Sequence, residues 1–366
     1  MAVTIAALKE TATGERRVAI TPETARKFLA RGLRVLLERD AGASAGFPDA
    51  GYIDVEFADV ATVLARADVL LAVQPPEVAV AAGLRRGAVL LGQLRPYGAG
   101  ERIAAWAAQG LTAFALERLP RTTRAQAMDT LSSQAAVAGY RAVLLAAEAS
   151  PRFFPMLTTA AGTVRPSRVL VIGAGVAGLQ AIATARRLGA QVDGFDVRPE
   201  TREQVQSLGA KFLDLGVSAA GSGGYARELT AEERARQQQA LAEHLRAMDV
   251  VISTAAVPGR QAPRILTAAM IEGMKPGAVV VDIAAESGGN CELTRADTRV
   301  EHGAVSILGP VNLAAGTPLH ASEMIARNFA NFTELLLHEG ELQPDFGDEL
   351  ISNTCIAHGG EVKFAG

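Results

Sequence analysis

Short apolar runs alternate with amphipathic, helix-like segments along most of the chain. In the first 120 residues the apolar runs are VTIAAL (3–8), RVLLE (34–38), ADVLLAV (67–73), AVLLGQL (88–94) and LTAFAL (111–116), and TPETARKFLARG (21–32) has a helical pattern. Strands that alternate with helices of this length predict a parallel sheet with helices on both faces.

A second cycle of the same kind begins at Val169. Its apolar runs are VLVIG (169–173), QVDGFDV (191–197), KFLDL (211–215), DVVIST (249–254), AVVVDIA (278–284) and VSILGP (305–310). A helical pattern at 322–340 and an apolar run at 351–357 then resemble the first cycle. We therefore expect the chain to return to the first lobe at its end.

These patterns predict an α/β fold with two lobes. The first lobe is residues 1–128 plus 313–366, the second is residues 149–312, and residues 129–148 form a helix that crosses between them. Ligands are commonly bound in the cleft between two lobes, so we expect the functional site there.

The crossing segment, RAQAMDTLSSQAAVAGYRA (124–142), predicts one continuous helix. Its apolar side, spaced by three and four, is Met128, Leu131, Ala135, Ala138 and Ala142. Its polar side is Gln126, Asp129, Ser132 and Ser133. Such groups can cap a helix and bond to neighbouring helices, or they can bind the polar groups of a ligand. The pattern leaves both interpretations open.

The sequence GAGVAG (173–178) directly follows the run VLVI and opens a helix. In a dinucleotide-binding turn the first glycine allows the turn, the second lets the backbone approach the pyrophosphate, and the third lets helix and strand pack closely. The helix N-terminus then offers N–H groups to the phosphates. The residues predicted to line this turn are Gly173, Ala174, Gly175, Val176 and Gly178. The second lobe is thus predicted to be a Rossmann-like domain, and the first lobe has the same strand and helix pattern.

Asp196 ends the next strand and can accept hydrogen bonds from an adenosine ribose diol. A carboxylate there repels a 2′-phosphate, which favours NAD(H) over NADP(H). Val197 and Arg198 follow at the same edge of the sheet and are included among the predicted cofactor contacts, although Arg198 taken alone is interpreted as a solvated residue after the strand. Two further loops, 253–263 and 282–292, come after later strands and so fall at the same carboxyl edge. The residues predicted to contact the cofactor there are Ala255, Pro258 and Glu286.

Candidate proton donors are scarce near these motifs. Between residues 28 and 210 there is neither lysine nor histidine, so Tyr52, Tyr97, Tyr140 and Lys9 remain as possible donors. A nicotinamide enzyme that reduces a carbonyl or imine needs such a group. Its scarcity fits a hydride transfer between two nicotinamide rings. A carboxamide and ribose hydroxyls could be bound by Gln126, Asp129 and Ser132, with Arg121 upstream.

The composition limits which kinds of molecule or surface the protein is expected to bind. The net charge is -3 with 20% charged residues, and no basic cluster suggests nucleic acid. Cys291 and Cys355 lie far apart without metal-ligand spacing, so we expect no metal site, no disulfide and a reducing compartment. The N-terminus lacks the pattern of a signal peptide, and the uncharged run 169–185, which contains the glycine motif, is shorter than the ~20 residues that a membrane span needs. No insertion into a membrane is expected.

Four segments together resemble the NAD(H)-binding domain I of proton-translocating nicotinamide nucleotide transhydrogenase. They are RTTRAQAMDTLSSQAAVAGYRAV (121–143), VLVIGAGVAGLQAIATARRLGAQV (169–192), GGYARE (223–228) and ISNTCIAHGGEV (351–362). The resemblance runs essentially end to end and is to the separate alpha-1 type subunit, since the chain stops before any membrane segments. It implies hydride transfer between NADH here and NADP(H) on a partner subunit, coupled to proton translocation.

The resemblance also implies partners and residue roles. The partners are an NADP(H)-binding domain, membrane proton-channel subunits and a second copy of the chain in a homodimer, on the cytoplasmic side of a bacterial inner membrane. Arg121, Asp129 and Ser132 would orient the nicotinamide and its ribose, and Gln126 would reach towards the partner's NADP(H). Tyr225 matches the tyrosine of a mobile loop that closes over NAD(H).

Alanine dehydrogenase is a relative of this family and shares the style of ERRVAITPE (15–23), including Arg17. In that relative a lysine and a histidine carry the substrate chemistry, and Gln74 and Arg95 occupy the matching places here. Neither can serve as the acid, which argues against amino-acid oxidation. The alternatives are an amino-acid dehydrogenase and a non-catalytic NAD sensor. The run GTPLHASEMIARNF (316–329) matches the family loosely, and we expect His320 at a surface or interface.

Overall fold

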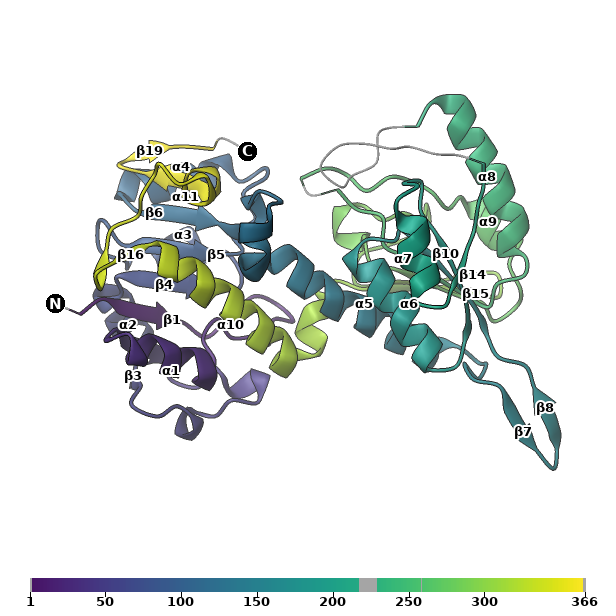
Figure 1. The fold of residues 1–366 in the computed structure, drawn as a ribbon, viewed down its shortest axis with the longest axis horizontal. Coiled ribbons are helices and arrows are strands. Elements are labelled where there is room, and N and C mark those ends of the chain that lie inside the picture. The colour runs from purple at the N-terminus through teal and green to yellow at the C-terminus, as the bar shows by residue number, and fades with distance from the viewer. Residues whose placement is uncertain (1, 217–228, 258, 365–366) are drawn as a thin grey trace. The chain divides into compact units, whose positions relative to one another are not determined.

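The computed structural model describes residues 2–216, 229–257 and 259–364 (Figure 1). Its internal contacts divide the chain into two compact units. Unit 1 is residues 1–134 with 314–366, and unit 2 is residues 135–313. The division falls inside the helix α5 (Thr130–Ala149). Each unit has its own large sheet and its own hydrophobic core.

Unit 1 is built on an eight-stranded sheet. In spatial order its strands are β3 (Glu56–Ala58), β2 (Arg34–Glu38), β1 (Thr4–Ala7), β4 (Val69–Ala72), β5 (Val89–Gly92), β6 (Thr112–Ala115), β18 (Cys355–His358) and β19 (Glu361–Val362). The first six are parallel in the chain order 3-2-1-4-5-6, which is the doubly wound order of dinucleotide-binding folds. Near its end the chain returns to this sheet, where β18 pairs with β6.

The returning strand differs from the predicted one in two ways. It runs antiparallel to β6, so the sheet is mixed at this edge. It also begins at Cys355, because residues 349–354 form the helix α11 (Glu349–Thr354). Asp348 starts that helix by accepting a hydrogen bond from the Leu350 backbone N–H, as an N-cap residue does.

Helices cover both faces of the unit 1 sheet, as the sequence predicted. One face packs against α1 (Pro22–Ala30), α10 (Pro318–Leu335) and α11, and the other against α2 (Val60–Arg66), α3 (Val78–Ala81) and α4 (Gly100–Gln109). Side chains of β1 alternate between the two cores, Ile5 and Ala7 on one side and Ala6 on the other. In Figure 1, α10 lies across the first of these faces. A small hairpin of β16 (Leu337–His338) and β17 (Glu341–Leu342) follows α10.

Unit 2 is built on a seven-stranded sheet. In spatial order its strands are β11 (Lys211–Phe212), β10 (Gln191–Phe195), β9 (Arg168–Ile172), β12 (Val250–Ser253), β13 (Val279–Asp282), β15 (Val305–Gly309) and β14 (Thr298–His302). The first six are again parallel in the order 3-2-1-4-5-6. The edge strand β14 is antiparallel and was not predicted, because its sequence TRVEH contains a single apolar residue.

The helices of unit 2 also form two layers. On one face lie α5, α6 (Val176–Arg187) and α7 (Thr201–Ser207), and on the other α8 (Ala231–Leu245) and α9 (Ala268–Glu272). Val169 and Val171 of β9 point into the first core, and Leu170 and Ile172 point into the second. A hairpin of β7 (Leu157–Thr159) and β8 (Gly162–Val164) projects from this unit in Figure 1.

The prediction of one continuous helix over 124–142 is wrong. Residues 123–128 form the 3-10 helix η4 (Thr123–Met128), and Asp129 then takes an extended backbone with ψ of 92°. The helix α5 begins at Thr130, because the Asp129 carboxylate accepts a hydrogen bond from the Ser132 backbone N–H at 2.9 Å. Aspartate favours such a capping role over a place inside a helix. The three-and-four spacing continues through the break, so the spacing alone could not locate it.

Within the three described ranges, no helix has the combination of length and apolar character that crossing a bilayer requires.

Candidate functional site

The glycine-rich turn lies between β9 and α6 in unit 2. Gly173 has a φ of 91°, in the left-handed region that favours glycine, and Gly175 is the residue before the first turn of α6. A Cβ atom on Gly178 would lie 1.7 Å from the Gly173 carbonyl oxygen, so the helix can pack on the turn only without a side chain there. A Cβ atom on Gly175 would meet nothing within 4 Å. There is therefore open space beside Gly175, whereas Gly178 packs tightly against the Gly173 carbonyl group.

The first turn of α6 presents its N-terminal end at this open space. Val176 begins the helix and is 45% exposed, whereas Ala174 is buried within the turn. The Ala174 N–H donates to the Asp196 carboxylate at 2.7 Å, so it supports the turn itself. The unpaired N–H groups of a helix N-terminus and its positive dipole end favour an anion such as a pyrophosphate.

Asp196, at the end of β10, is 8% exposed and lies beside the turn. The interpretation of Arg198 as a solvated residue is wrong. Its guanidinium donates to both Asp196 oxygens, from Nε to Oδ1 at 2.9 Å and from Nη2 to Oδ2 at 2.7 Å, and its side chain is 18% exposed. Burial against Asp196 rather than solvation explains its position, since a guanidinium matches a carboxylate in two parallel bonds.

The loops after β9, β12 and β13 are tied together at the carboxyl edge of the sheet. The Thr254 hydroxyl donates to the Gly173 carbonyl at 2.9 Å. The Asn290 side chain accepts from the Ser253 hydroxyl and the Ala255 N–H, and donates to the carbonyls of Ala255 and Pro263. The edge between β9 and β12 is where the strand order reverses, which is where open α/β sheets bind ligands.

Asp282 organises the loop after β13 from its interior. It is fully buried and accepts hydrogen bonds from the backbone N–H groups of Asn290 and Cys291 and from the Thr294 hydroxyl. Thr254, Asp282 and Asn290 were not singled out from the sequence. For Asp282 and Thr254 the signal was a polar residue at the end of an apolar strand or just after it. Asn290 lies within the loop after β13 and had no such signal.

The other cofactor-contact residues predicted for unit 2 lie in these loops or outside the described residues. Ala255 is held through its backbone by Asn290. Glu286 is exposed and accepts from the Asn312 N–H at 2.6 Å. Val197 is partly buried beside Asp196. Tyr225 and Pro258 lie outside the described residues.

The four residues predicted to act on the nicotinamide belong to unit 1. Asp129 and Ser132 are partly buried and in contact, with the Ser132 hydroxyl donating to Asp129 Oδ2 at 2.5 Å. Arg121 and Gln126 are exposed, Gln126 within η4. The neighbouring Ser133 donates to Asn328 of α10 at 2.7 Å. The polar side of the segment thus does cap a helix and link two helices, and Gln126 is its exposed member.

A buried polar network fills the carboxyl edge of the unit 1 sheet between β1 and β4. Arg17, 4% exposed, donates to both Glu15 oxygens at 2.8 and 2.6 Å and to Gln134 Oε1 at 2.8 Å. Gln74 donates to Glu15 Oε2 at 2.7 Å. Burial opposes ionisation of Glu15, but the hydrogen bonds and charge of Arg17 outweigh it and lower its pKa to about 2. The guanidinium is therefore already neutralised by the chain's own carboxylate.

Glu10 lies next to this network and carries a pH-dependent contribution to stability. Burial raises its pKa from 4.5 to about 8, against the backbone N–H groups of Val73 and Gln74 that stabilise its charge. Because the folded protein then binds this proton more tightly than the unfolded chain, the contribution is fully present below about pH 4.5 and is lost as the pH rises through 8. Glu10→Gln, which is always neutral, is expected to flatten the fall in unfolding free energy between pH 5 and pH 8.

Urea unfolding followed by Trp106 fluorescence measures this effect, because the chain's one tryptophan is buried in unit 1. Glu56→Gln is the matched control. Glu56 pairs with Arg66 on the surface, and this pair lowers its pKa, so its stabilising effect is lost only in acid. An unchanged slope in Glu10→Gln would contradict the assignment.

Other candidate groups add little to these sites. His320 is exposed at the start of α10. Cys291 and Cys355 are buried and not joined in a disulfide. Over the part of the chain that the structure describes, no three His, Cys, Asp or Glu side chains are grouped so as to hold a metal ion.

Comparison with known protein families gives two matches that together span the chain. The model described as "Alanine dehydrogenase/PNT, N-terminal domain" matches residues 6–138. The model described as "Alanine dehydrogenase/PNT, C-terminal domain" matches residues 142–365.

Individual relatives agree with this assignment. The chain is 42% identical over 367 residues to an NAD(P) transhydrogenase subunit alpha of Rickettsia prowazekii, covering 98% of this chain and 95% of that relative. A solved transhydrogenase from Sinorhizobium meliloti has a TM-score of 0.90 at 44% identity, over 98% of this chain and 99% of that one. An alanine dehydrogenase of Halomonas elongata is more distant, at 32% identity over 303 residues, covering 81% and 76%.

Proposed function

We propose the following function on the premise that the chain belongs to the alanine dehydrogenase/PNT family, whose two domain models match it. The protein is the NAD(H)-binding alpha subunit of an NAD(P) transhydrogenase. It transfers a hydride between NADH bound to itself and NADP⁺ bound to a partner subunit. The observation that carries this proposal is the similarity to subunits of that name over nearly their whole length, at higher identity than to an alanine dehydrogenase.

In this proposal unit 2 binds the adenosine and pyrophosphate of NAD(H). The open space at Gly175 and the N-terminus of α6 receive the pyrophosphate, and Asp196 accepts from the ribose. The loops after β12 and β13, which Asn290 ties together, form the neighbouring wall.

Unit 1 supplies the groups for the nicotinamide end. Arg121, Asp129 and Ser132 orient the ring and its ribose, and Gln126 reaches towards the NADP(H) of the partner. The hydride leaves C4 of the dihydronicotinamide with its electron pair and adds to C4 of NADP⁺, so NADH becomes NAD⁺ and NADP⁺ becomes NADPH. No proton is gained or lost at the reacting carbons, and holding the two rings in contact provides most of the acceleration.

The finer biological assignments follow from the family resemblance. The subunit would form a homodimer and bind peripherally, at the cytoplasmic face of a bacterial inner membrane, to an NADP(H)-binding domain and membrane proton-channel subunits. Hydride transfer would be coupled there to proton translocation.

Hydride transfer by the purified protein tests the proposal directly. NADPH is supplied with an NAD analogue whose reduced form absorbs at a shifted wavelength, with and without a recombinant NADP-binding domain from a transhydrogenase. We expect a rate only when that domain is present. Absence of a rate with a folded partner domain, while NADH still binds, would favour an NAD sensor that binds nucleotide without chemistry.

An alanine-dehydrogenase activity is the second candidate, and unit 1 argues against it. The carboxylate of an amino or keto acid needs a cation, but Arg17 is buried against Glu15. Gln74, in the place of that relative's lysine, is itself bonded to Glu15. The protein alone is therefore expected not to oxidise NADH with pyruvate and ammonia, and turnover in that assay would reverse the assignment.

A further inference from the structure

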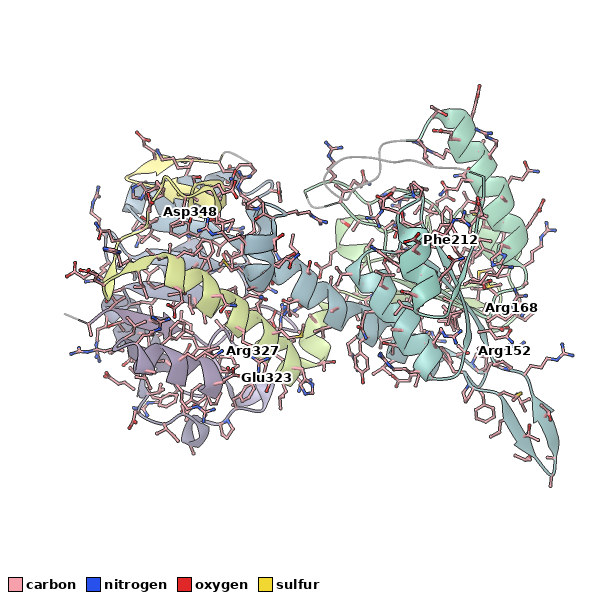
Figure 2. All side chains as sticks on the ribbon, viewed as in Figure 1. Arg152, Arg168, Phe212, Glu323, Arg327 and Asp348 are labelled. Carbon is pink, nitrogen blue, oxygen red and sulfur yellow. The ribbon has the colours of Figure 1, made fainter. Side chains whose placement is uncertain are left out.

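Two arginine–aspartate pairs lie at the adenosine end of the proposed nucleotide site. The inner pair is Asp196 with Arg198, and the outer pair is Asp214 with Arg202. Asp196 and Arg202 both line a cavity of about 150 Å³ at the ends of β10 and β11. Phe212, labelled in Figure 2, forms part of its wall, and the Arg202 guanidinium lies 4.6 Å from the centre of that ring.

The inner pair is the more buried and the more completely bonded. Its side chains are 18% and 6% exposed, compared with 45% and 60% in the outer pair. Asp196 Oδ1 accepts from the N–H and the Nε of Arg198, and Oδ2 accepts from Nη2 of Arg198 and from Ala174 N–H. Four donors therefore occupy the two oxygens of one carboxylate, which has about four acceptor positions.

Arg198 is thus a cation held against the residue that would bind the ribose. An adenosine ribose diol can bind Asp196 only by replacing or sharing some of these donors. A 2′-phosphate at the same place carries close to two negative charges. It would meet the negatively charged Asp196 carboxylate, which is already hydrogen-bonded to the Arg198 guanidinium. A planar guanidinium is otherwise well suited to bind phosphate through two parallel hydrogen bonds.

We propose that Arg198 decides nucleotide selectivity, because Asp196 keeps its guanidinium from a 2′-phosphate and removal of that carboxylate would turn Arg198 into a phosphate-binding residue. The preference of the wild type for NAD(H) is then the net effect of the pair, in which Arg198 offsets part of the repulsion that Asp196 exerts on a 2′-phosphate. The inference rests on the proposed nucleotide site of unit 2. Arg202 is excluded from this role because its own partner, Asp214, and its place over Phe212 hold it at the outer side of the cavity.

Titration of the full chain with NADH and NADPH tests the inference, since the two differ only in the 2′-phosphate. Asp196→Ser removes the carboxylate and leaves a small polar side chain beside the turn, so both oxygens that hold the Arg198 guanidinium are lost. This variant is expected to bind NADPH at least about tenfold more tightly than the wild type does, which is the scale of one charge-assisted bond. Adding Arg198→Ala should remove the gain, whereas adding Arg202→Ala should leave it in place.

The single variant Arg198→Ala keeps the carboxylate and removes only the cation. It should raise the ratio of the NADPH to the NADH dissociation constant at least about threefold, because Asp196 then repels the phosphate unopposed. The melting temperature and circular dichroism spectrum of each variant serve as the measure that it is folded, since Asp196 itself belongs to the proposed NADH site.

Three results would overturn the inference. They are an Asp196→Ser variant that binds NADH without gaining NADPH affinity, a gain that survives loss of Arg198, and a gain that depends on Arg202 instead. Failure of the wild type to bind NADH at all would overturn the proposed function itself, which distinguishes the two cases.

Discussion

Gly178→Ala is expected to destabilise unit 2 by about 3 kcal/mol and to abolish NADH binding. The added methyl group would lie 1.7 Å from the Gly173 carbonyl oxygen and 2.8 Å from the carbonyl carbon. Both atoms belong to the backbone of the turn, so no flexible side chain can move aside. Overpacking of this kind commonly costs about 1–3 kcal/mol, and a clash with backbone belongs at the upper end. The turn must shift, and the phosphate position shifts with it.

Gly175→Ala is the matched control from the same motif. Its Cβ would meet nothing within 4 Å, so the unfolding free energy should change by less than about 1 kcal/mol. NADH affinity should nevertheless fall at least about tenfold, because the methyl group fills the space that the pyrophosphate needs.

Calorimetry or circular dichroism follows the unfolding of the whole chain, while Trp106 fluorescence reports unit 1, so a transition that shifts only in the first measurement belongs to unit 2. If Gly178→Ala melts with the wild type and still binds NADH, the close packing of α6 on the turn is not required.

Asp129→Asn is expected to slow hydride transfer to the partner's NADP⁺ by about a hundredfold, with the melting temperature unchanged. Asparagine caps helices as well as aspartate does, so its oxygen can keep the bond to Ser132 N–H at the start of α5. The substitution removes the negative charge and the second acceptor oxygen. In the wild type that oxygen accepts a hydrogen bond from the Ser132 hydroxyl. A small displacement of the reacting ring can reduce the rate by two orders of magnitude.

The assay is the transfer rate from NADPH to the NAD analogue in the presence of the NADP-binding domain, together with a separate NADH titration. Asp59→Asn is the control, because Asp59 also caps a helix, α2, by accepting from Thr62 N–H. It should transfer hydride at the wild-type rate. A full rate in Asp129→Asn would mean that Asp129 serves only as a cap.

The apolar strands and the glycine turn could be predicted because the signal is local. Strands such as β4, β5 and β9 are buried on both faces, so they appear in the sequence as unbroken apolar runs. The edge strand β14 has polar residues on both faces and gives no such run. The glycines of 173–178 have spacing that follows from a single turn, and the turn is where it was expected.

Features that depend on a partner distant in sequence, or on exact loop geometry, were not predictable. The pairing of Arg198 with Asp196 needs the backbone to bend after β10 so that residues two apart meet. Asn290 joins loops that are well separated along the chain, and the sequence around Asn290 does not predict that its partner is Ala255. The break at Asp129 depends on one side chain competing with the helix for a backbone donor.

The two sheets share one winding order, but different residues lie at their reversal points. In unit 2 the glycine turn leaves space there, while in unit 1 Arg17 is surrounded by Glu15, Gln134 and, through Glu15, Gln74. Glu15 is thus a built-in counter-ion for Arg17, and a dissolved acid would have to displace it to bind that guanidinium. Keto acids would thus not bind to Arg17. The rate of hydride exchange between NAD(H) and NADP(H) would then not depend on the concentration of keto acids.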